Sequence, residues 1–272
     1  MHQPIAVMDS GVGGLTVVKE IMRQLPLENI IYFGDSERSP YGSKSLDIVK
    51  KYVFQIVDFL LQYNPKMIVI ACNTATAAAL NEISSYVDVP VIGVIEPGAR
   101  AAIKATRNHK IGIIGTEGTI QSGAYESALR QISPQVEAIA QACPRFAPLV
   151  ESGLFEQQTT YDVVSDSLYC LKEDKIDSLI LGCTHYPYLQ DTIQKVMGHS
   201  VELINSAEET AREISTILSH RGQLNQIKFQ QKHVFLCSGD AAIFSNIASR
   251  WLCEQIKVHA VSWRGIETVM NQ

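Results

Sequence analysis

Two of the six cysteines in this 272-residue chain occupy matching places in the sequence. Cys72 and Cys183 each follow a short apolar run and precede two polar residues, in the segments 68–74 and 179–185. A thiol has an ordinary pKa near 8.5, so near neutral pH it can accept a proton as thiolate or donate one as thiol. The two side chains are therefore candidates for acid–base chemistry.

Such a pair suits the inversion of a stereocentre. One group would remove the Cα proton from one face, and the other would deliver a proton to the opposite face. Cys72 and Cys183 would then be one thiolate and one thiol, with the roles exchanged in the reverse direction. This chemistry requires the two cysteines to stand on opposite walls of one cleft.

The elements that must position them alternate between short apolar runs and longer segments of helical periodicity. The sequence predicts strands at Ile5–Met8, Ile30–Gly34, Met67–Ala71, Val91–Val94, Lys110–Gly115, Val136–Ala140, Ser178–Gly182, Val201–Ile204, His233–Cys237 and Val258–Val261. It predicts helices at Leu46–Tyr63, Thr74–Ser84, Ile120–Ile132, Thr160–Lys172 and Glu208–Ser219. Continuous apolar strands separated by helices are typical of buried parallel sheets, so the expected class is α/β.

The strand ends repeat a pattern. Segments 5–11 and 111–117 each read as a buried strand that ends in a small or polar residue and a hydroxyl, and each precedes one of the two cysteine segments. The end of that strand and the cysteine are 63 residues apart in the first copy and 68 in the second. We interpret this as two similar domains, whose shared cleft lies beyond the carboxyl ends of the strands.

The cysteines need help to form a thiolate. We expect helices to begin just after each one, near Thr74 and after Pro187, because a helix N-terminus favours negative charge and lowers a thiol pKa. The same backbone N–H groups, with the hydroxyls of Thr74 and Thr184, are suited to hold a carboxylate. Asn73 adds a neutral amide.

Bulk composition excludes several classes of protein. Hydrophobic residues make up 46% of the chain and charged residues 19%, which is enough apolar material for a large core and too little charge for disorder. With a net charge of −5, the chain shows no sign of the clustered basic face that binding to nucleic acid requires. Apolar runs are too short to span a membrane, no secretory signal is visible, and no two cysteines have CxxC spacing. We expect a cytoplasmic protein with reduced thiols.

Several motifs of the chain resemble those of a known family. Segments similar to the signatures of bacterial glutamate racemases occur from the first strand to Trp263-Arg264, namely Asp9-Ser10-Gly11-Val12-Gly13-Gly14, Pro40-Tyr41-Gly42, Cys72-Asn73-Thr74-Ala75 and Gly182-Cys183-Thr184-His185-Tyr186-Pro187. The resemblance implies a pseudo-twofold pair of α/β domains with no pyridoxal phosphate and no metal. It also implies interconversion of L- and D-glutamate to supply peptidoglycan synthesis, and it leaves a homodimer as one option for assembly.

The resemblance also assigns roles to residues. Cys72 and Cys183 would be the acid–base pair, with Asp9 beside the first and Glu151 and His185 beside the second. The substrate site would be formed by Asp9, Ser10, Pro40, Tyr41, Gly42, Asn73, Thr74, Thr116, Thr119, Thr184 and His185.

Domain boundaries follow from the order of the elements. Residues 95–98, with a proline and a glycine, are interpreted as a crossing segment. The first domain would comprise residues 1–95 plus 206–272, and the second residues 96–205. The return of the C-terminal part to the first domain is supported by the resemblance and not by the pattern alone.

Simpler roles remain open for these residues. Asp9 and Ser10 could cap the following helix, residues 40–42 could form only a turn, and His185 could be a strand-end residue bonded to backbone. The glycines after Asp9 do not form a GxGxxG fingerprint, and no P-loop lysine follows. The other cysteines are expected to be packing residues.

Three other functions remain open for the whole chain. A cysteine hydrolase could pair Cys183 with His185 but would not explain Cys72. A related racemase could act on aspartate or a hydantoin. A binding module without catalysis could keep the cleft and should tolerate loss of both thiols.

Overall fold

Two parallel sheets organise the chain in this computed structural model, which describes residues 3–153, 158–226 and 231–263. The first sheet has the order β10-β9-β2-β1-β3-β4 and the second the order β6-β5-β7-β8, and every pairing is parallel. The order β2-β1-β3-β4 is thus repeated as β6-β5-β7-β8, as the duplicated pattern in the sequence predicts. The predicted α/β class is confirmed.

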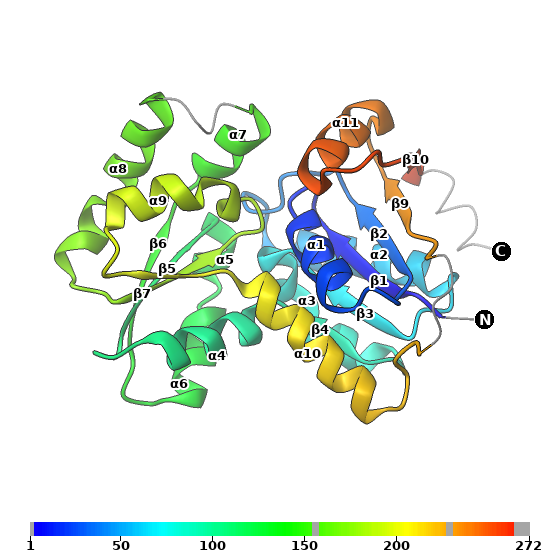
Figure 1. The fold of residues 1–272 in the computed structure, drawn as a ribbon, viewed down its shortest axis with the longest axis horizontal. Coiled ribbons are helices and arrows are strands. Elements are labelled where there is room, and N and C mark those ends of the chain that lie inside the picture. The colour runs from blue at the N-terminus through cyan, green and yellow to red at the C-terminus, as the bar shows by residue number, and fades with distance from the viewer. Residues whose placement is uncertain (1–2, 154–157, 227–230, 264–272) are drawn as a thin grey trace.

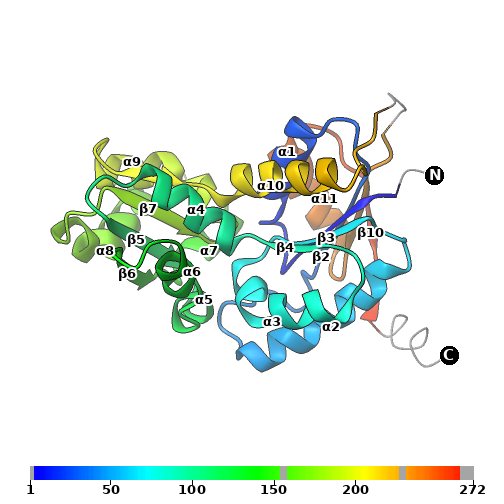
Figure 2. The same cartoon turned by 90° about the horizontal axis from the view of Figure 1, so that it is seen from below.

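The strands of the first sheet are β1 (Ile5–Asp9), β2 (Ile30–Gly34), β3 (Met67–Ile70), β4 (Val91–Gly93), β9 (Val234–Cys237) and β10 (Val258–Ala260). Helices α1 (Leu15–Gln24), α10 (Ser206–His220) and α11 (Ala241–Leu252) cover one face, and α2 (Leu46–Leu61) and α3 (Asn73–Tyr86) cover the other (Figure 2). We call this assembly the first lobe.

The second lobe contains β5 (Lys110–Gly115), β6 (Glu137–Ala142), β7 (Ser178–Gly182) and β8 (Glu202–Ile204). Its helices are α4 (Ile95–Ala105), α5 (Glu117–Gln121), α6 (Ala124–Ile132), α7 (Phe146–Glu151), α8 (Gln158–Glu173), the 3-10 helix η1 (Tyr186–Leu189) and α9 (Gln190–Met197). The lobes lie side by side, and α10 contacts α1 of the first lobe and α4 of the second (Figure 1).

Alternation along β1 shows how the sheets are buried on both faces. Ile5 and Val7 pack with α1 and α10, whereas Ala6 and Met8 pack with α2 and α3. All five residues of β1 are buried. Successive side chains of a strand point to opposite faces, so a continuous apolar strand is the expected form here.

A buried ion pair fastens the segment between α10 and β9 to the first lobe. Lys66 Nζ lies 2.5 Å from a carboxylate oxygen of Glu28, and both side chains are almost fully buried. The same ammonium group donates to the carbonyl of Gln223 at 2.7 Å, and Glu28 accepts from the backbone N–H of Asn225 at 2.9 Å.

One predicted element was wrong, and another has a different local structure. Residues 95–98, which the sequence predicts to be a crossing segment, form the first turn of α4 between β4 of the first lobe and the second lobe, and Pro97 is tolerated there because its N–H would have no partner inside the helix. The single helix expected over residues 120–132 is divided into α5 and α6 at Gly123, whose φ of 64° is a left-handed conformation that glycine adopts readily.

The other predicted bounds agree with those above or differ from them by at most two residues. Arg264, quoted with the C-terminal motif, lies outside the described residues. No helix in the described part of the chain is long and apolar enough to cross a membrane.

Candidate active site

Cys72 and Cys183 stand just beyond the carboxyl ends of strands from different lobes. Cys72 follows β3 and precedes α3, and Cys183 follows β7 directly. Their residues are only 6% and 7% exposed, yet both line one narrow cavity between the lobes. The sequence predicted this meeting of the two thiols.

The cavity brings together every predicted site residue except Asp9 and Thr119. Its volume is about 30 Å³. It is lined by Ser10, Ser39, Pro40, Tyr41, Gly42, Cys72, Asn73, Thr74, Thr116, Ala147, Glu151, Gly182, Cys183, Thr184 and His185. Ser39, Ala147 and Gly182 were not predicted as site residues, although Gly182 begins one quoted motif and Ser39 directly precedes another.

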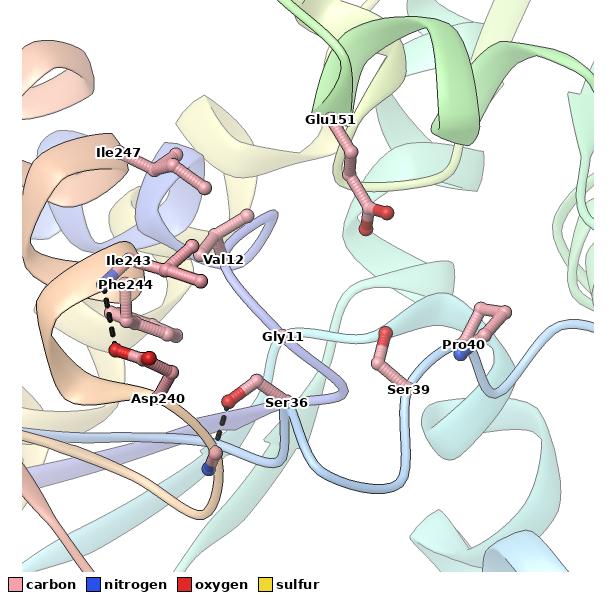
Figure 3. Close-up of a pocket in the computed structure, with 11 residues that line it drawn as sticks. Gly11, Val12, Ser36, Ser39, Pro40, Glu151, Asp240, Ile243, Phe244 and Ile247 are labelled. Atoms are coloured by element: carbon pink, nitrogen blue, oxygen red, sulfur yellow. Dashed lines mark hydrogen bonds between the residues drawn. The ribbon is translucent and has the colours of Figure 1, made fainter.

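A larger outer pocket of about 410 Å³ adjoins this cavity and shares Ser39, Pro40 and Glu151 with it. Figure 3 shows Ile243 and Ile247 of α11 on one side and Glu151 of α7 on the other. The shared residues place the inner cavity behind this more open pocket.

Asp9 lies beneath the cavity and connects the two lobes. One of its carboxylate oxygens accepts from the N–H of Gly11 at 3.0 Å, and the other accepts from the Thr184 hydroxyl at 3.3 Å. Burial raises the pKa of this carboxyl, while the charge of His185 and the hydrogen bonds oppose that rise. The backbone N–H of Gly14, the N-cap residue of α1, is among the donors to this carboxylate, so Asp9 also contacts the start of that helix.

The surroundings of Cys72 raise its pKa to about 12. Burial is the largest cause, the carboxylate of Asp9 adds to it, and the N–H of Ala75 and the hydroxyl of Ser10 oppose it. The predicted influence of the helix N-terminus is therefore present, since Ala75 lies in the first turn of α3. However, the expected net lowering of the pKa was wrong for Cys72, because desolvation of the thiolate outweighs that influence.

Cys183 has a different setting. Its Sγ lies 3.8 Å from Nδ1 of His185, and Nε2 of the same ring lies 3.1 Å from a carboxylate oxygen of Glu151. That second contact is an ion pair without the angle of a hydrogen bond. Burial alone would lower the pKa of His185, but interactions with Cys183 and Glu151 outweigh burial and raise the pKa to about 10.

The helix expected after Pro187 is α9, which starts at Gln190, and the 3-10 helix η1 precedes it from Tyr186, with His185 at its N-cap. The His185 ring therefore lies between Cys183 and the start of η1 in the sequence, and its Nδ1 faces the thiol.

His185 is covered by an aromatic pair that sequence reasoning missed. Trp251 of α11 meets the His185 ring edge-on at a centroid distance of 6.2 Å and stacks on Tyr188 at 3.9 Å. Trp251 belongs to the first lobe and Tyr188 to the second, so this stack also joins the lobes. It shields the imidazole from water on one side.

Three threonine hydroxyls meet across the cleft. Thr74 Oγ1 lies 2.9 Å from Thr116 Oγ1 and 3.1 Å from Thr119 Oγ1, and the last two are 3.0 Å apart. Nearby, the N–H of Gly118 donates to the carbonyl of Gly42 at 2.9 Å. Thr119 thus contacts the lining residues without lining the cavity itself.

The loop that carries Pro40, Tyr41 and Gly42 is anchored at Asp35. Buried Asp35 accepts hydrogen bonds from the Tyr41 hydroxyl and from Nε of Arg38, the latter at 2.7 Å. The guanidinium of Arg38 lies over the Trp263 ring at 3.5 Å. No local signal in the sequence pointed to Asp35.

Within the described residues, no lysine or arginine is among those lining the inner cavity. Anionic groups would therefore be held by hydroxyls, the Asn73 amide and backbone N–H groups, which is the donor set that the sequence predicted for a carboxylate. The described residues also contain no group of three or more His, Cys, Asp or Glu side chains placed to hold a metal ion.

The profile of the Asp/Glu/Hydantoin racemase family matches residues 5–214. The chain belongs to this family. The expectation of an amino-acid racemase is thereby confirmed. A protein of Bacillus cereus (strain ATCC 10987 / NRS 248), named glutamate racemase, is 51% identical over 257 residues, which cover 94% of this chain and 96% of that protein.

Solved structures agree with the fold of this racemase. The crystal structure of glutamate racemase isoform RacE1 from Bacillus anthracis matches with a TM-score of 0.94 at 50% identity, over 96% of this chain and 98% of that one. A glutamate racemase from Francisella tularensis subsp. tularensis SCHU S4, crystallised with D-glutamate, matches with a TM-score of 0.90 at 33% identity, over 96% and 98%.

Proposed function

We propose that this racemase interconverts L- and D-glutamate by two-base proton transfer between Cys72 and Cys183, without a cofactor. The observation that supports it most is that the two thiols, from different lobes, line one buried cavity. The names of relatives at about half identity support glutamate as substrate. A cysteine hydrolase would have no use for the second thiol.

The proton transfers balance in each direction. In one direction, a thiolate removes the Cα proton and becomes a thiol, while the opposite thiol gives its proton to the other face of Cα and becomes a thiolate. The carbanionic intermediate carries the electron pair between these two steps. The reverse reaction starts from the exchanged protonation states.

The two cysteines have different neighbours. Cys72, with a pKa raised to about 12, is a thiol near neutral pH. His185, with a pKa of about 10, is an imidazolium near neutral pH, and its Nδ1 lies 3.8 Å from Cys183 Sγ. We infer that one cysteine removes the Cα proton of L-glutamate and that the other removes the Cα proton of D-glutamate.

The remaining lining residues would orient the substrate. Asp9 provides the carboxylate nearest the Cys72 side for the substrate ammonium group. Asn73, Thr74, Thr116 and Thr184 provide neutral donors for the carboxylates, and Tyr41 and Gly42 add loop backbone. Neutral donors hold an anion without a buried positive charge that would need its own partner.

The test is incubation with L-glutamate in D₂O and no added cofactor. We expect loss of the Cα proton signal by NMR together with decay of the circular-dichroism signal as D-glutamate forms. Absence of both with folded, reduced protein would refute the proposal. Parallel assays with aspartate and a hydantoin distinguish the other substrates of the family.

Single substitutions test the pairing. Cys72→Ala and Cys183→Ala should each abolish racemisation, because one face of Cα then has no proton partner. Cys253→Ala serves as a control, since this exposed cysteine lies outside the cavity. Near-normal turnover in either cavity variant would contradict the two-base assignment.

The setting of this activity is part of the same proposal. We propose that the product D-glutamate supplies peptidoglycan synthesis in the cytoplasm, and we keep a homodimer as one option for assembly.

We also propose the domain division into residues 1–95 plus 206–272 and residues 96–205. Its support is that β9 and β10 share a sheet with β1 to β4. Limited proteolysis that releases a fragment near 96–205 would test it.

A further inference from the structure

A buried tyrosine of the second lobe contacts a residue of the first lobe that lines the cavity. The hydroxyl of Tyr125, on α6, donates to Oδ1 of Asn73, the first residue of α3, at 2.7 Å. Tyr125 is 1% exposed and Asn73 is 3% exposed. A hydrogen bond this short, between fully buried groups, fixes the orientation of the partners.

The hydroxyl of Ser206 lies next to the phenolic oxygen of Tyr125, which is the donor in this hydrogen bond. Ser206, the first residue of α10, and the Tyr125 hydroxyl converge on Gly98, where an added Cβ would lie 3.1 Å from Ser206 Cβ and 3.4 Å from the tyrosine oxygen. Burial raises the pKa of Tyr125, and a hydrogen bond from Ser206 opposes that rise, as expected of a serine that donates to the phenolic oxygen. The one proton of Tyr125 is then available to Asn73.

This arrangement fixes the Asn73 carboxamide. A carboxamide has one oxygen that accepts and one NH₂ group that donates. Because the oxygen accepts from Tyr125, the NH₂ group is the part left to serve the cavity. The reversed amide would present its oxygen to a substrate carboxylate, and two acceptors facing each other repel.

The Tyr125 ring also contacts the opposite side of the site. A Cβ at Gly182, the residue before Cys183, would lie 3.1 Å from Cε2 of Tyr125. One side chain thus supports the strand end that carries Cys183 and the helix start that follows Cys72.

We propose that Tyr125 is a positioning residue, which holds the Asn73 amide as a hydrogen-bond donor to a carboxylate of the substrate. This inference rests on the proposed function, since it takes an amino dicarboxylate as the ligand. Ser206 completes the arrangement by occupying the acceptor site of the tyrosine. Three elements, α3, α6 and α10, therefore define the polarity of one donor.

The test compares Tyr125→Phe with Tyr186→Phe in racemisation assays in both directions. Tyr186 is an equally buried tyrosine, and its hydroxyl donates to a backbone carbonyl, that of Cys143, at 2.9 Å. Both variants lose one buried hydrogen bond, so both should lose some stability. Only Tyr125→Phe should raise KM, by about tenfold, the scale of one hydrogen bond to a charged group, with kcat within about threefold.

A double-mutant cycle with Asn73→Ala distinguishes an effect of Tyr125 that acts through the Asn73 amide from a general loss of structure. If Tyr125 acts through the amide, Tyr125→Phe should change KM by less than about twofold once Asn73 is alanine, the limit within which independent sites add. Equal effects on KM in the two backgrounds would overturn the proposal, as would equal rises in KM in Tyr125→Phe and Tyr186→Phe.

A third variant covers the case in which Tyr125→Phe does not fold. Ser206→Ala keeps the tyrosine ring and removes only the group that orients its hydroxyl. We expect KM to rise by about threefold, the lower end of what one neutral hydrogen bond contributes, and an unchanged KM would overturn the proposal. A wild-type protein inactive on L-glutamate would instead refute the proposed function.

Discussion

A methyl group added at Gly42 should push the two lobes apart. In the structure, a Cβ at this position would lie 2.4 Å from Cβ of Thr116 and 2.6 Å from its Cγ2. Ordinary contacts between such atoms begin near 3.4 Å, so the loop and the second lobe must separate by about 1 Å. Neither neighbour is the flexible end of a long side chain.

The loss of catalytic efficiency can be estimated from the hydrogen bonds that such a shift would break. The Gly118 N–H to Gly42 carbonyl bond and the Thr74–Thr116 hydroxyl contact are both 2.9 Å long, and a further 1 Å takes them beyond bonding distance. At about 1 kcal/mol each, their loss costs about 2 kcal/mol, or about thirtyfold in kcat/KM if the reaction requires the closed arrangement.

The assay is kcat/KM for L-glutamate racemisation by Gly42→Ala, with stability measured in parallel. Gly11→Ala is the control, because a Cβ there would meet only Ser39, with Oγ at 3.4 Å and Cβ at 3.9 Å, which are ordinary contact distances. We expect the control to stay within about twofold, inside the usual range for a substitution without a steric clash. A folded Gly42→Ala protein with kcat/KM within threefold of wild type would refute the closed arrangement as the reactive one.

Three further outcomes follow from the contacts described above. Glu151→Gln removes a negative charge from beside His185 and so lowers its pKa from about 10. Because the imidazolium is lost as pH rises, the alkaline limb of kcat/KM should move down by about half a pH unit, a small shift because Glu151 is partly exposed. An unmoved limb would contradict the ion pair. Lys66→Met leaves the carboxylate of Glu28 buried without its partner and should cost about 3 kcal/mol in the free energy of unfolding, measured with urea. A loss below 1 kcal/mol would show that the pair is not needed. Finally, D-glutamate should reduce the radius of gyration in X-ray scattering, and identical curves with and without it would exclude closure.

The raised pKa of His185 also makes the stability of the folded protein depend on pH. The pKa of His185 is raised above its ordinary value near 6.5, so the protonated ring is favoured by folding. This contribution to stability is fully present below pH 6.5 and is lost as pH rises toward 10. Since Glu151 is 44% exposed, solvent screening reduces its share of the contribution.

The sequence was sufficient for features that depend on local patterns. Apolar runs located the strands because a parallel sheet buried on both faces demands continuous hydrophobicity. The two cysteines could be paired because each follows the corresponding strand of a repeated pattern, and a cleft shared by two such domains lies beyond the carboxyl ends of their strands. Gly123 did carry a signal for a helix break, and the prediction of one helix over residues 120–132 overlooked it.

Features that depend on burial and long-range contact could not be predicted. The rise in the pKa of Cys72 comes mainly from desolvation, which no spacing reveals. Tyr125 is 52 residues from Asn73, and its role depends on two lobes meeting. Glu151 was named only through the resemblance, because a glutamate at the end of a short helix has no distinctive pattern.

The contacts that align the two thiols are the same contacts that hold the lobes together. Asp9 with Thr184, Asn73 with Tyr125, and Gly42 with Gly118 each join one residue of the first lobe to one of the second. At about 1 kcal/mol apiece, they favour closure without preventing opening. We expect the lobes to open for substrate entry, because Cys72 and Cys183 are only 6% and 7% exposed in the cavity between them. A stronger set of contacts would align the cysteines equally well but would slow the release of product.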